Sequence, residues 1–208
     1  MQIPEYRMRQ IKETSETVRS RLKLGDVCFV DFFNVVFPRL RSIFPTFQIV
    51  RLPDSAMPNA EAFADTECKH ISIRESIWQA LVNGDPRARF TVAHEIGHLF
   101  LGHTAYTARS NDPSMYRDPF TKTQESEANA FASLFLMPTD LAEKFNTADD
   151  IQNNFGVSRH SAAIRIEELD REKRKKAGQK RKLPQNAVDF LSEAKKRGIP
   201  IKSDLSSE

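Results

Sequence analysis

One apolar stretch constrains this chain most strongly, because it places three of the five histidines inside a segment that must be buried. Residues 87–103 read RARFTVAHEIGHLFLGH. Apolar or small residues recur there at intervals of three and four, as at Phe90, Ala93, Gly97 and Leu101. This spacing predicts a helix that is buried on most sides. Imidazoles and a carboxylate in such a helix need polar partners or a metal.

Two of these histidines form an H-E-x-x-H motif, in which His94 and His98 enclose Glu95. A spacing of four residues puts both imidazoles on one helical face, about 6 Å apart at their roots. Two neutral imidazole nitrogens can bind one Zn²⁺. Glu95 lies one step round the helix, where it can take a proton from an attacking water instead of binding the metal. The motif therefore predicts a zinc site with Glu95 as the catalytic residue.

A third protein ligand is needed, because a catalytic zinc usually has three. His103 follows His94 by nine residues, which puts it on the far side of the helix, so we expect it at the helix end. A better source is the second apolar helix predicted over residues 123–137, TQESEANAFASLFLM, with Thr123 as its cap and Pro138 as its stop.

Two acids of that second helix are candidates. Glu125 shares a stripe with the small residues Ala128, Asn129 and Ala132, which would let the helix approach Gly97 and Gly102 closely. Glu127 shares the bulkier stripe of Phe131 and Leu134. We favour Glu125 as the ligand and keep Glu127 as the alternative. Asn129, four residues after Glu125, is placed to hold a ligand by a hydrogen bond.

The remaining pattern predicts an α+β chain. Helices are expected over 8–24, over 29–44 with Asp31 as cap and a break near Pro38, over 74–83, over 148–169 as two helices joined at a glycine, and over 187–196. Strands are expected over 45–52 and, as a pair, over 62–73 with a turn near Thr66–Lys69, whereas 104–122 is expected to be a loop.

Composition narrows the class of protein. A chain of 208 residues with 39% hydrophobic and 28% charged residues suits one domain with an appendage, or two small ones. No run approaches the roughly 18 apolar residues of a membrane span, and the first residues do not resemble a secretory signal. Cys28 and Cys68 stand alone, which excludes a disulfide scaffold and a thiolate zinc finger. We expect a cytoplasmic protein with no membrane partner.

The charge is unevenly distributed along the chain. Residues 170–208 hold twelve Lys or Arg against six Asp or Glu, so this part carries +6 and the rest −3. The run 171–182 has eight basic residues and one acid. Such a run can bind nucleic acid. We interpret it as a solvated helix end or mobile tail, with nucleic-acid binding at most weak and non-specific.

The two histidine- and glutamate-bearing blocks resemble the ImmA/IrrE family of metallopeptidases. RARFTVAHEIGHLFLGH is similar to that family's RF-x-x-AHE-x-GH helix, and ESEANAFASLFLMP to its E-x-E-A-N-x-F-A…LMP helix. The resemblance implies a minimal zincin-like fold: a small twisted sheet, an HExxH helix and a Glu-bearing helix. It implies His94, His98 and Glu125 as zinc ligands and Glu95 as base and acid. It also implies an endopeptidase that cleaves a helix-turn-helix repressor and so regulates transcription in stress responses or mobile elements.

On this basis we expect a metallopeptidase domain over 1–140, a helical segment like a helix-turn-helix over 141–175, and a basic, partly disordered tail over 176–208. In the middle segment, Arg159 and His160 start the second helix, where DNA-reading side chains would sit. The acids Glu167, Glu168 and Asp170 on the same helix favour a hairpin that braces the peptidase or holds its substrate.

Two other functions remain open at this stage. One is a DNA- or protein-binding regulator whose metal serves folding or sensing, and the other is a toxin-like partner in a two-component module. Glu95 argues against the regulator, because a structural metal needs no base. The group that supports the oxyanion is also open, with Arg89, Tyr106 and Tyr116 as candidates.

Overall fold

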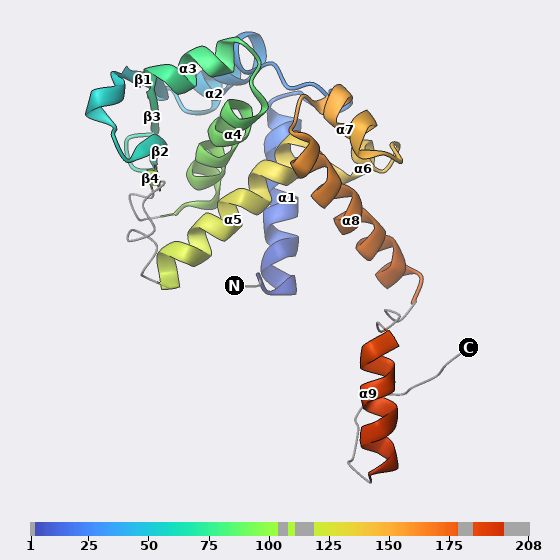
Figure 1. Ribbon diagram of the computed structural model, residues 1–208. Helices are drawn as coiled ribbons and strands as arrows, with labels where there is room; N and C mark the ends of the chain where they lie inside the picture. The colour runs from blue at the N-terminus through green and yellow to red at the C-terminus, as the bar shows by residue number, and fades with distance from the viewer. Residues whose placement is uncertain (1–2, 104–107, 111–118, 179–184, 198–208) are drawn as a thin grey trace. The chain divides into compact units, whose positions relative to one another are not determined.

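The computed structural model describes residues 3–103, 108–110, 119–178 and 185–197. The chain divides into two compact units, Met1–Leu169 and Asp170–Glu208. The first unit holds the sheet and most of the helices (Figure 1). The three-part domain assignment made above stays a prediction. No helix in the described part of the chain combines the length and apolar character that a membrane span needs.

A small four-stranded sheet forms one side of the first unit. Its strands are β1 (Gln48–Leu52), β2 (Ala60–Asp65), β3 (His70–Arg74) and β4 (Ala108–Ser110), in the order β1-β3-β2-β4. β3 pairs in parallel with β1 and antiparallel with β2, and β2 pairs antiparallel with β4. The first three strands lie where the sequence predicted them. β4 lies within the range expected to be a loop, because three residues carry too short a pattern to recognise.

The N-terminal helices and α3 follow the sequence with shifted ends. They are α1 (Glu5–Arg21), a π-helical segment (Phe32–Val36), α2 (Phe37–Ile43), a 3₁₀ turn (Asp54–Ala56) and α3 (Glu75–Val82). Asp31 caps the π-helical segment, as expected, by accepting from the backbone N–H groups of Phe33 and Asn34. The helix changes type at Phe37, and Pro38 falls in the first turn of α2, where its missing N–H costs nothing.

Two long helices form the centre of the first unit: α4 (Pro86–Leu101) and α5 (Pro119–Leu136). α4 packs against β2 on one side and α5 on another, and α5 in turn packs against α1 (Figure 1). Asp85 caps α4 by accepting from the N–H of Ala88 at 2.8 Å, and Gly102 ends it in the left-handed conformation at φ 68°. α5 begins at Pro119, so Thr123 lies inside the helix and the cap predicted there is wrong.

The close approach of α4 and α5 has a different origin from the one expected. A Cβ on Gly97 would meet the ring of Phe131 at 3.0 Å, so Gly97 accommodates Phe131 of the facing helix. Nothing lies within 4 Å of a Cβ built on Gly102. The bulky stripe of α5, and not the alanine stripe, therefore fits against Gly97.

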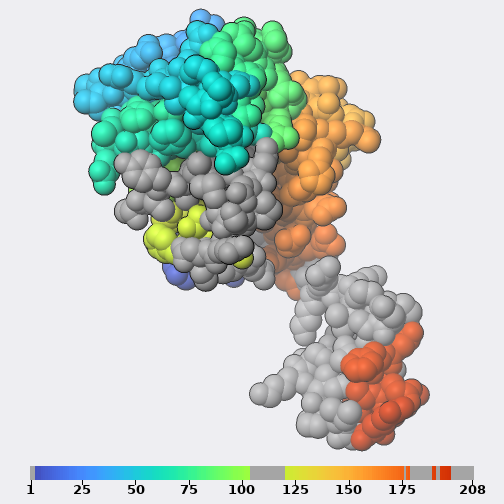
Figure 2. Space-filling view, turned by 60° about the vertical axis from the view of Figure 1, so that its left-hand side comes forward, coloured from blue at the N-terminus to red at the C-terminus, as the bar shows by residue number. Residues whose placement is uncertain are grey.

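Three further helices follow α5 along the chain: α6 (Thr139–Ala142), α7 (Ala148–Phe155) and α8 (Arg159–Lys176). α7 and α8 are joined at Gly156, which is left-handed at φ 64°. Their apolar side chains enter the main core of the first unit through Ile151, Phe155, Val157, Ala162 and Leu169. Figure 2 shows orange residues of α7 and of the part of α8 up to Leu169 beside green residues of the α3–α4 region. The second unit contains α9 (Gln185–Lys196), near the helix predicted over 187–196.

Candidate metal centre

The H-E-x-x-H residues lie in the buried middle of α4. His94, Glu95 and His98 each expose at most 1% of their surface. The four-residue spacing brings the two rings together, with their centroids 4.7 Å apart and their Nε2 atoms 3.0 Å apart. α4 therefore presents two imidazole edges to one point, with a carboxylate beside them on the same helix.

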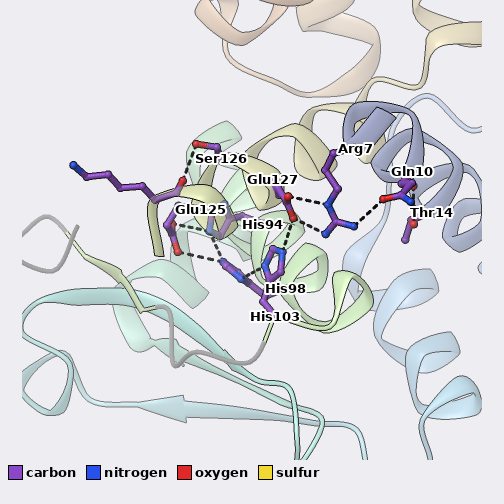
Figure 3. Close-up of polar contacts among 10 residues, drawn as sticks. Arg7, Gln10, Thr14, His94, His98, His103, Glu125, Ser126 and Glu127 are labelled. Atoms are coloured by element: carbon purple, nitrogen blue, oxygen red, sulfur yellow. Dashed lines mark hydrogen bonds and ion pairs between the residues drawn. The ribbon is translucent and has the colours of Figure 1, made fainter. Parts of the chain in front are cut away.

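Glu125 reaches this point from α5 (Figure 3). One of its carboxylate oxygens lies 3.3 Å from Nε2 of His94, and the other lies 3.4 Å from Nε2 of His98. The donor atoms of these three buried residues all lie within 4.8 Å of one another and could hold a metal ion.

The chemistry and spacing of these donors fit a zinc ion. Tetrahedral zinc binds His nitrogen and carboxylate oxygen at about 2.0–2.2 Å, which places neighbouring donors about 3.3–3.5 Å apart. The three observed separations, 3.0, 3.3 and 3.4 Å, are close to that value. Two imidazoles and one carboxylate are also a donor set that zinc accepts, leaving a fourth position for water or substrate.

Asn129, one turn after Glu125 on α5, orients the first histidine. Its Oδ1 lies 3.0 Å from Nδ1 of His94. An amide oxygen can only accept, so Nδ1 of His94 carries the proton and donates. The lone pair of the neutral ring is then on Nε2, which faces Glu125. This is the position that the sequence pattern assigned to Asn129.

Glu127 occupies a different position from Glu125, although they lie only two positions apart in the sequence. Arg7 of α1 donates to both of its oxygens, from Nε at 2.8 Å and from Nη2 at 2.6 Å. Nε2 of His103 lies 3.1 Å from the same carboxylate. The structure thus brings Glu125, and not Glu127, to the two histidines of the motif.

His103 does more than end the helix. Its backbone N–H donates to the carbonyl of His98 at 3.3 Å, as expected for a residue just past the helix end. Its side chain, 4% exposed, turns back so that its Nδ1 lies 2.7 Å from Nδ1 of His98. Spacing along an ideal helix missed this contact, because the left-handed Gly102 reverses the chain direction. The signal available in the sequence was the third histidine itself, directly after a glycine.

Burial and the neighbouring charges shift the acidities of the site. Burial would raise the pKa of Glu125, but the electrostatic influence of His94 and His98 outweighs it and lowers that pKa to about 2. Burial, together with the neighbouring His94, lowers the pKa of His98. Burial, together with the neighbouring His98, lowers the pKa of His103 to about 4. His98 and His103 are therefore held neutral and Glu125 ionised near neutral pH, and a neutral imidazole and an ionised carboxylate are the forms that bind metal.

The candidates for oxyanion support separate into two groups. Arg89 is buried and donates to the backbone carbonyls of Val30, Phe155 and Gly156, so its guanidinium joins α4 to the α7–α8 turn. Its guanidinium carbon also lies 3.9 Å from the centroid of the Phe29 ring. These contacts give Arg89 a structural role. Tyr106 and Tyr116 lie outside the described residues.

A second group with ligand-type atoms lies in the hairpin between β2 and β3. Asp65, Cys68 and His70 have donor atoms within 4.8 Å of one another. The carboxylate of Asp65 accepts from the backbone N–H groups of Glu67 and Cys68, at 2.9 and 2.8 Å. These bonds close the turn predicted near Thr66–Lys69, and they account for the grouping without a metal.

An H-E-x-x-H helix packed against a helix that supplies a third, acidic donor defines the zincin class of metallopeptidase site. Residues 48–167, more than half of the chain, match the family Peptidase_M78, described as the IrrE N-terminal-like domain, and the chain belongs to this family of metallopeptidases. The resemblance seen in the sequence is thereby confirmed. Among curated proteins, none matches the chain significantly.

A solved structure supports the fold. The chain is similar to a structure titled Mycobacterium tuberculosis transcriptional regulator, with a TM-score of 0.51 and 17% sequence identity. The match covers 75% of this chain and 46% of that one, so this chain spans less than half of the regulator's length. At this identity the likeness concerns the fold, and it agrees with the α+β, zincin-like architecture expected from the sequence.

Proposed function

We propose that the protein is a zinc-dependent endopeptidase that cleaves a helix-turn-helix transcriptional repressor. The observation that carries the proposal is the convergence of His94, His98 and Glu125 on one buried point, with Glu95 beside them on α4. The family of the chain supports peptidase chemistry. The repressor as substrate rests on the resemblance to ImmA/IrrE proteins, and the regulator among the similar structures links this fold to transcription.

The chain's own residues divide the work of peptide hydrolysis. His94, His98 and Glu125 would hold the zinc, and Asn129 would fix the ring of His94. Zinc bound there supplies Lewis-acid polarisation of the peptide carbonyl and activation of water. Glu95 takes up the proton of the attacking water and delivers it to the leaving amine. A metal held only for folding would need no such base on the same helix.

A DNA-binding regulator is the competing function, and the helix pair α7–α8 is the reason to consider it. Its apolar face is buried in the main core. Arg159, at the start of α8, is ion-paired with Asp149 of α7 at 2.8 Å. These contacts favour a role of α7–α8 in bracing the peptidase unit or in contacting a protein substrate.

The test is incubation of the protein with a helix-turn-helix protein from a gene adjacent to its own, where the genome has one, with and without a chelator. Wild-type protein should cleave it, and the chelator should stop cleavage. Glu95→Gln should keep the metal but lose at least about 100-fold in rate, as expected for loss of a general base. Glu16→Gln is the matched control, because Glu16 is an exposed acid of α1, away from the proposed catalytic residues and from α7–α8.

Two results would contradict the proposal. Near-normal cleavage by Glu95→Gln would place the base elsewhere. Tight binding to one DNA sequence at physiological salt, with no proteolysis of the neighbouring protein, would support the regulator instead.

A further inference from the structure

A line of four polar side chains runs from the candidate metal centre to the N-terminal helix (Figure 3). His98 contacts His103, His103 contacts Glu127, and Glu127 contacts Arg7. The N–N separation between the two rings is 2.7 Å, and the separation between Nε2 of His103 and the carboxylate is 3.1 Å. The first three side chains are buried, so water does not compete for these contacts.

Counting protons fixes the direction of every bond in this line. A ring nitrogen of His98 that binds a metal through its lone pair carries no proton, so the neutral ring carries its proton on Nδ1. That Nδ1 lies against Nδ1 of His103, and two nitrogens at 2.7 Å share one proton. Nδ1 of His103 must therefore accept, which leaves the proton of His103 on its Nε2.

The far end of the line agrees with this assignment. Nε2 of His103 faces the carboxylate of Glu127, which can only accept. Arg7 donates two parallel hydrogen bonds to that carboxylate, a geometry that keeps it ionised and fixed in orientation. Hydrogen bonds from Arg7 and His103 also lower the pKa of Glu127 against the opposing effect of its burial.

We infer that His103 is a positioning residue, which orients His98 and holds its proton on Nδ1 so that Nε2 is available to a metal. This inference rests on the proposed function, in that it takes His98 as a ligand. His103 serves His98 as Asn129 serves His94, with an acceptor against Nδ1 of each ring. His103 differs in being itself held by a second pair, Glu127 and Arg7.

The line also explains why His103 is not a further ligand. Both of its ring nitrogens are used, one by His98 and one by Glu127. Its contribution is therefore to the affinity of the site and to the geometry of His98, and not to the number of donors. Partners of this kind typically change metal affinity by about 10–100-fold when they are removed.

Two substitutions of similar shape separate the acceptor from the packing. His103→Asn places an amide oxygen near the position of Nδ1, so it retains an acceptor for His98. His103→Leu has the same branching but no acceptor. His160→Leu is the control, because His160 is an exposed histidine of α8. The affinity for zinc is measured by competition with a chromogenic chelator, which requires no peptidase activity.

We expect His103→Leu to weaken zinc binding about 10–100-fold, His103→Asn to weaken it much less, and His160→Leu to leave it unchanged. Equal affinities of His103→Leu and wild type would overturn the inference while leaving the proposed function intact. Equal losses in the Leu and Asn variants would show that His103 acts by packing alone, which also overturns it. Absence of zinc binding in the wild type would remove the proposed function and this inference together.

A second measurement uses the unaltered protein, in case a variant does not fold. Nitrogen-15 NMR of the zinc-loaded chain distinguishes protonated from unprotonated ring nitrogens. The inference requires a proton on Nδ1 of His98 and on Nε2 of His103. A proton on Nδ1 of His103 would reverse the bond between the rings and overturn the inference.

Discussion

Two helix pairs of this protein, α4–α5 and α7–α8, use polar residues in opposite ways. Between α4 and α5, imidazoles and carboxylates face one another inside the molecule, at His94, His98 and Glu125. In α7–α8 the apolar side chains face inward, and the ion pair of Arg159 with Asp149 lies in solvent. The buried arginine of α8, Arg165, donates to the backbone carbonyl of Met137 and to the hydroxyl of Thr139. Buried polarity thus serves a ligand site in the first pair and attachment of the helices in the second.

The largest effect should follow from changing a donor in α4–α5. Glu125→Gln removes the charged donor, so we expect loss of stoichiometric zinc and of peptidase activity by at least about 100-fold. Glu127→Gln is the matched change two residues away. It should keep one zinc per chain with weaker affinity, because it weakens the support of His103 and the ion pair with Arg7 but removes no donor of the site. Metal analysis after dialysis distinguishes the two variants. If Glu125→Gln and a second single variant, His98→Ala, both keep stoichiometric zinc, the site is misassigned.

The next effect concerns stability and belongs to α7–α8. Arg165→Met keeps much of the buried volume but leaves the carbonyl of Met137 and the hydroxyl of Thr139 without this donor. We expect the free energy of unfolding to fall by about 2–4 kcal/mol, with zinc stoichiometry unchanged. Urea denaturation of the metal-loaded protein measures it. Loss of zinc in this variant would show instead that Arg165 and the α7–α8 pair also support the metal site.

Acid should destabilise the metal-free protein through the histidines at the α4–α5 pair. The unfolded chain takes up protons at histidines near their ordinary pKa of about 6.5. Burial and His98 oppose the charge of folded His103 and lower its pKa to about 4. The folded state therefore binds fewer protons between these values, so its stability is full above about pH 6.5 and declines as the pH falls toward 4. Urea denaturation at a series of pH values tests this.

The control for the acid experiment is His103→Asn, which has no titrating group at position 103. Its stability should decline less steeply over the same range, with the remaining decline attributable in part to His98, whose pKa burial also lowers. Identical pH dependence in the two proteins would show that His103 is not a source of the acid sensitivity.

The smallest effect is expected at the exposed start of α8. Arg159→Ala breaks an ion pair whose side chains are both largely exposed, so the free energy of unfolding should change by less than about 1 kcal/mol. Zinc content should be unchanged, and weak binding to a labelled DNA duplex should remain. A large loss of duplex affinity that is specific to one sequence would identify Arg159 as a DNA-reading residue.

The sequence predicted the parts of the site that depend on local spacing. The four-residue interval of His94 and His98 follows from helix geometry, and the apolar surroundings placed α4 in the core. Glu125 and Asn129 could be assigned because they lie four residues apart on one predicted helix, and the structure brings both to the histidines. The three longer strands were predictable from their alternating or β-branched residues.

Interactions between distant parts of the chain were beyond that reasoning. Arg7 and Glu127 are 120 residues apart, and no local pattern connects an arginine of α1 with an acid of α5. The ring of His103 contacts His98 just after the left-handed Gly102 ends the helix, so helical spacing does not predict this contact. The fit of Phe131 against Gly97 depends on how each helix is rotated about its axis. Hydrophobic spacing shows which face of a helix is buried, but not which residues of two buried faces meet.

Gly97 has a consequence for how the site could be altered from outside. It touches none of the three donors through a side chain, yet the ring of Phe131 lies where its Cβ would be. A larger residue there would require Phe131 to give way by a few tenths of an ångström, and Phe131 belongs to α5, the helix that carries Glu125. Gly97 is therefore a point where the two helices that carry the donors pack closely. For an engineer, position 97 offers a way to alter the packing of the two ligand-bearing helices without replacing a ligand.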